Sequence, residues 1–249
     1  EKEEAAILAK NEQLRANLLR TISHDLRTPL TSISGNANNL LYNESCLDAQ
    51  MRRQIYGDIY DDSMWLIDLV ENLLSVTRIE EGRMQIRQSA ELVDEVIKEA
   101  LKHTGQSRTG RTIKVEEEDE LILAKMDARL IVQVLINLIG NAVKYTPQGT
   151  DITVRVKKEK AENAERSQVI ISVCDLGNGI PDDRKERVFD MFYTGSDQVA
   201  DSRRSLGLGL GLCRSIINAH GGKIWISDNI PHGAVVTFTL PAEEVALNE

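Results

Sequence analysis

Over residues 1–82, apolar side chains recur every three or four positions, the spacing of amphipathic helices that pack along one seam. A polar break at residues 42–48 separates two such runs, and the second ends near Gly82. The first seam comprises Leu19, Ile22, Leu26, Leu30, Ile33, Ala37 and Leu40, and the second comprises Met51, Ile55, Ile59, Leu66, Val70, Leu73 and Thr77. This pattern predicts an antiparallel all-α hairpin. Because one hairpin cannot bury both seams, we expect a homodimer through residues 1–82 that forms a four-helix bundle; the alternative is that the hairpin folds back on the second domain.

After Arg83 the pattern changes to short strands that alternate with helices. Strands are predicted at 84–87, 111–115, 121–124, 152–156, 169–174, 222–227 and 234–240, and helices at 90–102, 128–144 and 213–220. Asp127 is the expected N-cap of the middle helix, and the acidic run at 116–120 is most simply a solvated turn. We therefore expect two domains, 1–82 and 83–249, the second an α+β sandwich with helices on one face of a mixed sheet.

Composition narrows the possible functions of these 249 residues. The chain is 41% hydrophobic and 28% charged, and no apolar run approaches the ~20 residues of a membrane span, so we expect no direct membrane contact from it. A net charge of −9 disfavours a nucleic-acid surface. The three cysteines lack zinc spacing and are expected to be reduced. The charged start at Glu1 is typical of a helix that continues from a longer protein.

His24 is the first candidate for chemistry. It lies two residues from both Ile22 and Leu26, and at about 100° per residue this turns the ring roughly 200° from the seam, toward solvent. Asp25 is adjacent, and Thr28 follows one turn later on the same side. Taken alone, these residues fit a surface histidine on a long helix equally well.

The helix expected at 128–144 has a second, polar face. Its members recur at three- and four-residue steps: Asn137, Asn141, Lys144 and Tyr145. Two carboxamides, an ammonium and a phenol suit a metal-bound triphosphate, because a carboxamide oxygen can bind Mg²⁺ without adding negative charge. The plainer alternative is an amphipathic helix with a solvated face.

Two glycine-rich segments complete the candidate site. Asp175-Leu-Gly-Asn-Gly-Ile-Pro181 follows a buried strand, where glycines let a ligand approach the backbone, although a simple turn would have the same composition. Gly207-Leu-Gly-Leu-Gly-Leu212 opens a helix, whose N–H groups and dipole favour phosphate. It matches neither a dinucleotide fingerprint nor a Walker loop.

These segments resemble, in order, the boxes of sensor histidine kinases. Ser23-His-Asp-Leu-Arg-Thr-Pro-Leu30 is similar to the phosphoacceptor box, 137–146 to the asparagine box, 175–181 to the first glycine box, 189–193 to the phenylalanine box, and 207–212 to the second glycine box. The resemblance covers nearly the whole chain. Its phosphoacceptor region is most similar to potassium-responsive sensor kinases of the KdpD type.

The resemblance implies a GHKL-type (Bergerat) ATP-binding domain that uses ATP and Mg²⁺ to phosphorylate His24. Asp25 would orient the imidazole, and Thr28 would assist dephosphorylation of the partner, a response-regulator receiver domain that takes the phosphoryl group on an aspartate. Asn141 would bind the metal. The implied nucleotide-binding residues are Asn137, Asn141, Lys144, Tyr145, Asp175, Gly177, Gly179, Ile180, Phe192, Gly207, Leu208, Gly209, Leu210 and Gly211. The chain is then expected to be the cytoplasmic portion of a membrane-anchored bacterial sensor.

Two positions depart from the family pattern. Thr194 stands where members often carry an arginine, for which Arg203 or Arg204 are candidate substitutes, and Ser205 replaces a glycine before the second glycine box. Both changes put the rate of phosphotransfer in doubt. Two other functions therefore stay open: a GHKL-fold ATPase that acts as a clamp or chaperone, and a scaffold that binds ATP without transferring phosphate.

Overall fold

The computed structural model describes residues 23, 26–43, 46–80, 86–103, 112–118, 121–160, 167–191, 193 and 207–243. The chain divides into two compact units, with the division after Thr77, and each unit is described by itself. Within these ranges, none of the helices combines the length and the hydropathy needed to span a bilayer.

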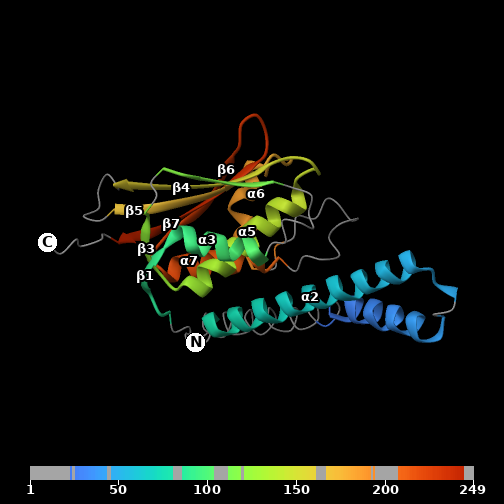
Figure 1. Cartoon of the computed structure of the whole chain (residues 1–249). Coiled ribbons are helices and arrows are strands. Elements are labelled where there is room, and N and C mark those ends of the chain that lie inside the picture. Colours follow the sequence, from blue (N-terminus) through green and yellow to red (C-terminus); the bar gives the residue numbers. More distant parts are fainter. Residues whose placement is uncertain are drawn as a thin grey trace, which may run out of the picture. The chain divides into compact units, whose positions relative to one another are not determined.

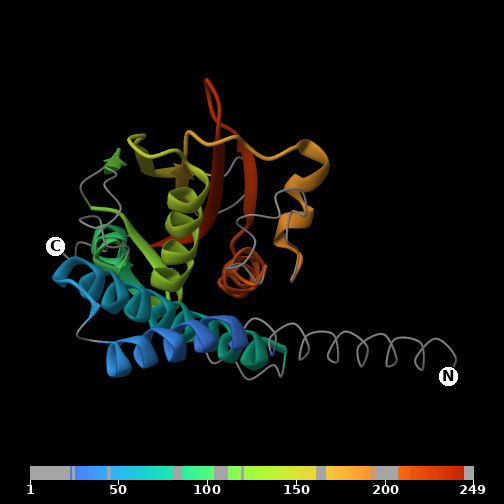
Figure 2. The same ribbon diagram turned by 90° about the vertical axis from the view of Figure 1, so that its right-hand side faces the viewer.

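The first unit contains the predicted helical hairpin. A helix over residues 26–42 lies antiparallel to α2 (Ala49–Glu80), as Figures 1 and 2 both show. Asp48 explains where α2 begins, because its Oδ1 accepts a hydrogen bond from the Met51 N–H at 2.7 Å, the geometry of an N-cap. The chain therefore reverses within the polar break expected from the sequence.

Helix α2 carries two apolar faces. One is half-buried or buried within the hairpin and comprises Ile55, Ile59, Leu66, Leu69 and Leu73. The other, called here the exposed stripe, comprises Tyr56, Tyr60, Met64, Ile67, Val70 and Leu74, each between 39% and 59% exposed. The placement of Val70 in the hairpin seam is wrong, because its side chain is 46% exposed and continues the stripe, within about 40° of Leu74 around the helix at about 100° per residue. Met51, also expected in the seam, is 50% exposed.

The second unit is built on one mixed sheet. Its described strands are β1 (Ser89–Leu92), β2 (Ile113–Glu117), β3 (Leu123–Met126), β4 (Ile152–Lys160), β5 (Ser167–Cys174), β6 (Ile224–Asp228) and β7 (Ala234–Glu243). They run in the order β1-β3-β7-β5-β4-β2, with β6 paired to β7 beside β3. Only the β2–β4 pair among these is parallel, and β7 pairs with β5 from Gln168↔Pro241 to Cys174↔Val235.

Helices α3 (Val93–His103), α5 (Ala128–Tyr145) and α7 (Gly209–Ala219) cover one face of this sheet (Figure 1), with α5 packed between the other two. The short α6 (Asp182–Lys185) and η2 (Arg187–Phe189) follow β5. The layer between helices and sheet holds the largest fully buried side chains, among them Ile97, Met126, Leu135, Ile139, Ile171, Leu212 and Phe238. This arrangement confirms the predicted α+β sandwich.

Several predicted boundaries are wrong. Leu92 belongs to β1 rather than to the following helix, because β1 pairs with β3 in the register Leu92↔Leu123, and Ile86 and Arg87 lie outside any strand. β3 and β6 each begin two residues later than expected. Residues 116 and 117 of the acidic run belong to β2, and both are exposed. Asp127 does occupy the N-cap position of α5, but its side chain makes no capping bond. Its Oδ2 instead accepts from the Arg87 N–H at 3.2 Å.

Candidate functional site

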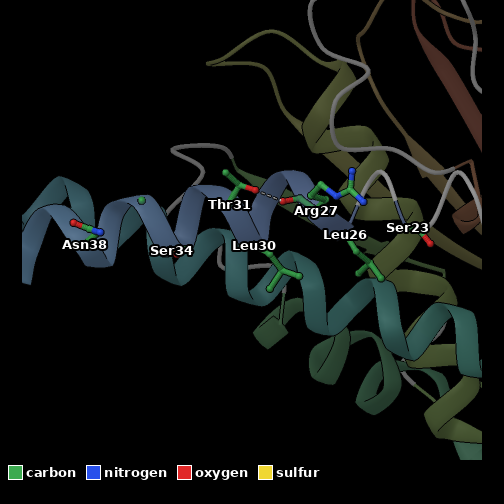
Figure 3. Close-up of a pocket in the computed structure, with 8 residues that line it drawn as sticks. Ser23, Leu26, Arg27, Leu30, Thr31, Ser34 and Asn38 are labelled. Carbon is green, nitrogen blue, oxygen red and sulfur yellow. Dashed lines mark hydrogen bonds between the residues drawn. The ribbon is translucent and has the colours of Figure 1, made fainter.

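The predicted phosphoacceptor lies partly outside the described residues, since His24 and Asp25 are not among them. Thr28 lies on the helix at 26–42 and is exposed. Figure 3 shows the residues that line a groove along this helix, with Leu26 and Leu30 extending toward α2. It is lined by Ser23, Leu26, Arg27, Leu30, Thr31, Ser34, Gly35 and Asn38.

The polar face of α5 is present as the sequence predicts. Ile131, Leu135, Leu138 and Ala142 are buried, whereas Asn137, Asn141 and Lys144 are half-buried and Tyr145 is 57% exposed. The Lys144 ammonium lies 5.0 Å from the centre of the Tyr145 ring, a cation–π contact that keeps both side chains at the end of α5. The amide of Asn137 donates from Nδ2 to the Gln133 carbonyl at 3.1 Å, so its Oδ1 is turned away from the helix backbone.

Asp175 is the most strongly organised residue of the candidate site. It follows β5 directly and is only 9% exposed. Its Oδ1 accepts the N–H of Gly177 at 2.8 Å and the N–H of Ala234 at 3.2 Å. From the described part of the chain, Oδ2 receives no hydrogen bond. A buried carboxylate oxygen without a partner is costly, so Oδ2 is available to accept a donor from a ligand.

The Asp175 turn lies against the end of α5. A Cβ added at Gly177 would be 2.6 Å from the Tyr145 carbonyl oxygen and 3.0 Å from Asp175 Oδ1. Only a residue without a side chain permits this approach. Gly179, with φ +71°, turns the chain out of this contact toward Ile180, which is half-buried.

The N-terminus of α7 meets the same face of α5. A Cβ added at Gly209 would lie 3.1 Å from Asn137 Oδ1, and Gly207 has φ +64°. Leu208 is 3% exposed and anchors this end, while Cys213 Sγ approaches the Val134 carbonyl at 3.8 Å one turn later. The backbone N–H groups at the start of α7 therefore lie close to Asn137.

Residues 189–191 contact the glycine-rich start of α7. A Cβ at Gly211 would lie 2.8 Å from Met191 Sδ and 3.2 Å from the Phe189 carbonyl oxygen. Arg214 reinforces the contact through ion pairs to Glu186 at 3.0 Å and Asp190 at 3.2 Å. Phe192, Arg203 and Arg204 lie outside the described residues, as do the departures Thr194 and Ser205.

His220 is a residue whose role the sequence analysis missed, because there it is only the last residue of the helix expected at 213–220. It is 2% exposed, and its Nε2 accepts the Asp127 backbone N–H at 3.0 Å. Nδ1 lies 2.8 Å from the Ile216 carbonyl oxygen and must therefore carry the proton. Burial lowers the pKa of this imidazole, which joins the C-terminus of α7 to the N-terminus of α5. No spacing in the sequence signals such a contact across 93 positions.

Buried thiols flank the site without reactive character. Cys174 precedes Asp175 and is 3% exposed, and burial raises the pKa of its thiol. Burial likewise raises the pKa of the Cys213 thiol. Both are free cysteines, as is the exposed Cys46, in agreement with the expectation of reduced cysteines. The described residues also contain no group of three His, Cys, Asp or Glu side chains able to hold a metal ion.

Comparison with known protein families matches both units. Residues 14–82 match the family described as "His Kinase A (phospho-acceptor) domain", and residues 126–244 match "Histidine kinase-, DNA gyrase B-, and HSP90-like ATPase". The sensor protein KdpD of Clostridium acetobutylicum is 41% identical over 98% of this chain, which spans 26% of that relative. The chain thus covers about a quarter of the length of this curated relative.

Solved structures agree with these matches. The catalytic domain of the histidine kinase ThkA is 31% identical, with a TM-score of 0.50 over 62% of this chain and 95% of that one. The histidine kinase ThkA in complex with the response regulator TrrA is 25% identical, with a TM-score of 0.63 over 94% of this chain and 64% of that one.

Proposed function

We propose, because this chain belongs to the sensor histidine kinases, that its second unit binds ATP and donates the γ-phosphoryl group to His24 of the hairpin. The observation that carries the proposal is the convergence of three segments. The polar face of α5, the Asp175 turn and the N-terminus of α7 meet through the close approaches at Gly177 and Gly209. Each segment supplies a different part of a nucleotide site.

The adenine base would bind beside Asp175, and the phosphates would bind beside the N-terminus of α7. Asp175 Oδ2 can accept from the amino group of adenine, since Oδ1 is already engaged by two N–H groups. The N–H groups at the start of α7 and the dipole of this 11-residue helix favour the phosphates. Lys144 adds a mobile positive charge at the end of α5. Gly179 and Ile180 would border the base, and Gly207–Gly211 the phosphates, with Phe192, Arg203 and Arg204 as further candidates.

Magnesium fits the donors of this site. A cation held mainly by phosphate oxygens and water needs few protein ligands, which agrees with the lack of a three-residue metal cluster among the described residues. The Asn141 carboxamide would supply one oxygen, with Asn137 beside it. When bound, the metal would offset the negative charge of the triphosphate.

The chemistry at His24 is a phosphoryl transfer. A neutral imidazole nitrogen forms a bond to the γ-phosphorus as the bond to the β–γ bridging oxygen breaks, and ADP leaves. The ring is available at neutral pH because its ordinary pKa is about 6.5. Asp25 would accept a hydrogen bond from the other ring nitrogen and stabilise the charge that develops on the ring. The product would be a phosphoprotein.

We propose that the partners are a second copy of the chain and a receiver domain. Two copies can cover the exposed stripe of α2, whose six apolar side chains are otherwise 39–59% exposed. The groove beside Thr28 offers mixed polar and apolar side chains to a receiver domain whose aspartate would take the phosphoryl group. The histidine kinase ThkA has been solved with a response regulator, and this supports the same kind of partner here.

Labelling with γ-³²P-ATP tests the proposal. We expect acid-labile, base-stable label on the wild-type chain and none on His24→Ala, with ATP affinity unchanged in the variant. An ATPase would release phosphate without retaining label, and a silent scaffold would bind ATP without doing either, so each result selects one function.

Thr28→Ala is expected to keep autophosphorylation and to slow dephosphorylation of the receiver domain. An unchanged dephosphorylation rate would contradict that role. A cytoplasmic position in a membrane-anchored sensor stays a prediction.

A further inference from the structure

The turn between β6 and β7 contacts the Asp175 segment at three alternating positions. The Asn229 amide donates from Nδ2 to the Asp175 carbonyl at 2.7 Å. His232 Nδ1 lies 3.1 Å from the Gly177 carbonyl oxygen, so it must donate a proton to it. A Cβ added at Gly179 would lie 3.2 Å from the Gly233 carbonyl oxygen. The whole segment from 175 to 179 therefore lies along this turn.

The same turn also fixes the carboxylate itself. The Ala234 N–H donates to Asp175 Oδ1 at 3.2 Å, and the Asp175 N–H donates back to the Ala234 carbonyl at 2.9 Å. A Cβ at Gly233 would be 2.0 Å from the Asp175 carbonyl oxygen, and Gly233 has φ +112°, so the two backbones touch. With Oδ1 held in this way, the direction of Oδ2 is set by the turn.

The turn is also closed by hydrogen bonds of its own. The Asn229 N–H donates to the Gly233 carbonyl at 3.0 Å, and Asn229 Oδ1 accepts the Ile230 N–H at 3.0 Å. Ile230, at its tip, is 90% exposed. Asn229 therefore closes the turn through its backbone N–H and reaches Asp175 through its side-chain amide. The side chain of Ile230, by contrast, points into solvent.

We propose that Asn229 and His232 are positioning residues that aim Asp175 Oδ2 at the exocyclic amino group of the base, and so set the preference for adenine over a 6-oxo purine. The inference rests on the proposed ATP site. A purine with a 6-oxo group would present an acceptor to a carboxylate that cannot turn away, because its other oxygen and its backbone are both bound. Rejection of such a base depends on that rigidity.

Affinities of the 249-residue chain for ATP and inosine triphosphate, measured by titration calorimetry with Mg²⁺, test the proposal. Asn229→Asp keeps the acceptor for Ile230 but removes the donor to Asp175. His232→Leu removes the donor to Gly177, and His232→Asn restores an amide hydrogen near the place of Nδ1. One lost hydrogen bond corresponds to about a 3- to 10-fold change, so each loss should lower the ATP-to-inosine-triphosphate preference by about that factor. His232→Asn should regain most of it.

Two further variants separate the possible failures. Ile230→Ala is the matched control at the tip of the same turn and should keep the wild-type preference. Asp175→Asn should abolish that preference. If Asp175→Asn does so while Asn229→Asp and His232→Leu keep it, the positioning role is overturned and the nucleotide site stands. A wild-type chain that binds no ATP would overturn the proposed site itself, whereas one that binds both nucleotides equally would overturn the preference that the turn is proposed to set. A uniform loss of affinity for both nucleotides would reduce the turn to a structural role and would also contradict the proposal.

Discussion

The sheet-containing unit buries its large apolar side chains, whereas the hairpin leaves many of its own exposed. In the second unit, side chains such as Leu135, Ile171 and Phe238 are fully buried between sheet and helices. In the hairpin, Leu69 is the large apolar side chain that reaches burial in the described part of α2, and the six residues of the exposed stripe remain accessible. A layered unit closes its own core, whereas two helices leave one face of each open.

This difference separates the two tasks proposed for the chain. The nucleotide site needs atoms fixed within a fraction of an ångström, and the second unit supplies them through buried contacts such as that between His220 and Asp127. The hairpin needs a surface that meets other proteins. The exposure of apolar side chains on α2 makes it suited to contact a second copy and a receiver domain.

Removing a core side chain of the second unit should have the largest effect. Phe238 is 0% exposed and lies in β7 opposite both Ile171 and Ile224. Phe238→Ala should lower the free energy of unfolding of this unit by about 3–5 kcal/mol, because the cavity cannot collapse between paired strands. Urea unfolding followed by near-UV circular dichroism measures it. Ile230→Ala, at a 90% exposed position, should change it by less than about 0.5 kcal/mol. A cost below about 1 kcal/mol for Phe238→Ala would refute the contrast between the units.

A charge on the exposed stripe should break the dimer without disturbing ATP binding. Ile67 is 49% exposed near the middle of the stripe. Ile67→Asp places two carboxylates at the contact between copies, so we expect the dimer dissociation constant to rise about 100-fold, or about 2.7 kcal/mol. Light scattering over a concentration series measures this. Gln54→Asp, on the opposite side of α2, is the control. A dimer of unchanged stability would show that the stripe is not the interface.

Low pH should weaken the second unit selectively through His220. Burial lowers its pKa from the ordinary 6.5, so between the two values the unfolded chain binds more protons than the folded one. Stability from this group is complete above about pH 6.5 and falls as the pH drops toward the folded pKa. The Asp127 carboxylate, which favours the protonated ring, only partly offsets the effect.

We expect the free energy of unfolding, measured in urea, to fall as the pH drops from 7 to 5.5, because the unfolded chain takes up the proton first. His220→Gln should remove this dependence. His103→Gln should leave it intact, because the side chain of His103 is 58% exposed. A pH dependence that survives His220→Gln would assign it to other groups.

The sequence predicted those parts of the site that depend on local spacing. The polar face of α5 and the position of Asp175 after a buried strand follow from periodicity, and the structure places them as expected. The parts of the fold and site that the sequence did not predict depend on contacts between residues far apart in the chain. Leu92 is in a strand because Leu123 pairs with it, and Asn229 serves the site because the chain returns to Asp175 across 54 positions. No local pattern encodes either contact.

The smallest expected effect comes from the same substitution made in both units. Gly57 in α2 and Gly140 in α5 are exposed helical glycines, and a Cβ at either would meet nothing within 4 Å. Gly140→Ala should stabilise the second unit by about 0.5–1 kcal/mol, because alanine loses less backbone freedom in a helix. Gly57→Ala should raise the thermal stability of the hairpin to a similar extent. Differential scanning calorimetry compares the two. A gain at Gly140 with a loss at Gly57 would mean that the second copy approaches α2 at this glycine, which would extend the dimer contact beyond the exposed stripe.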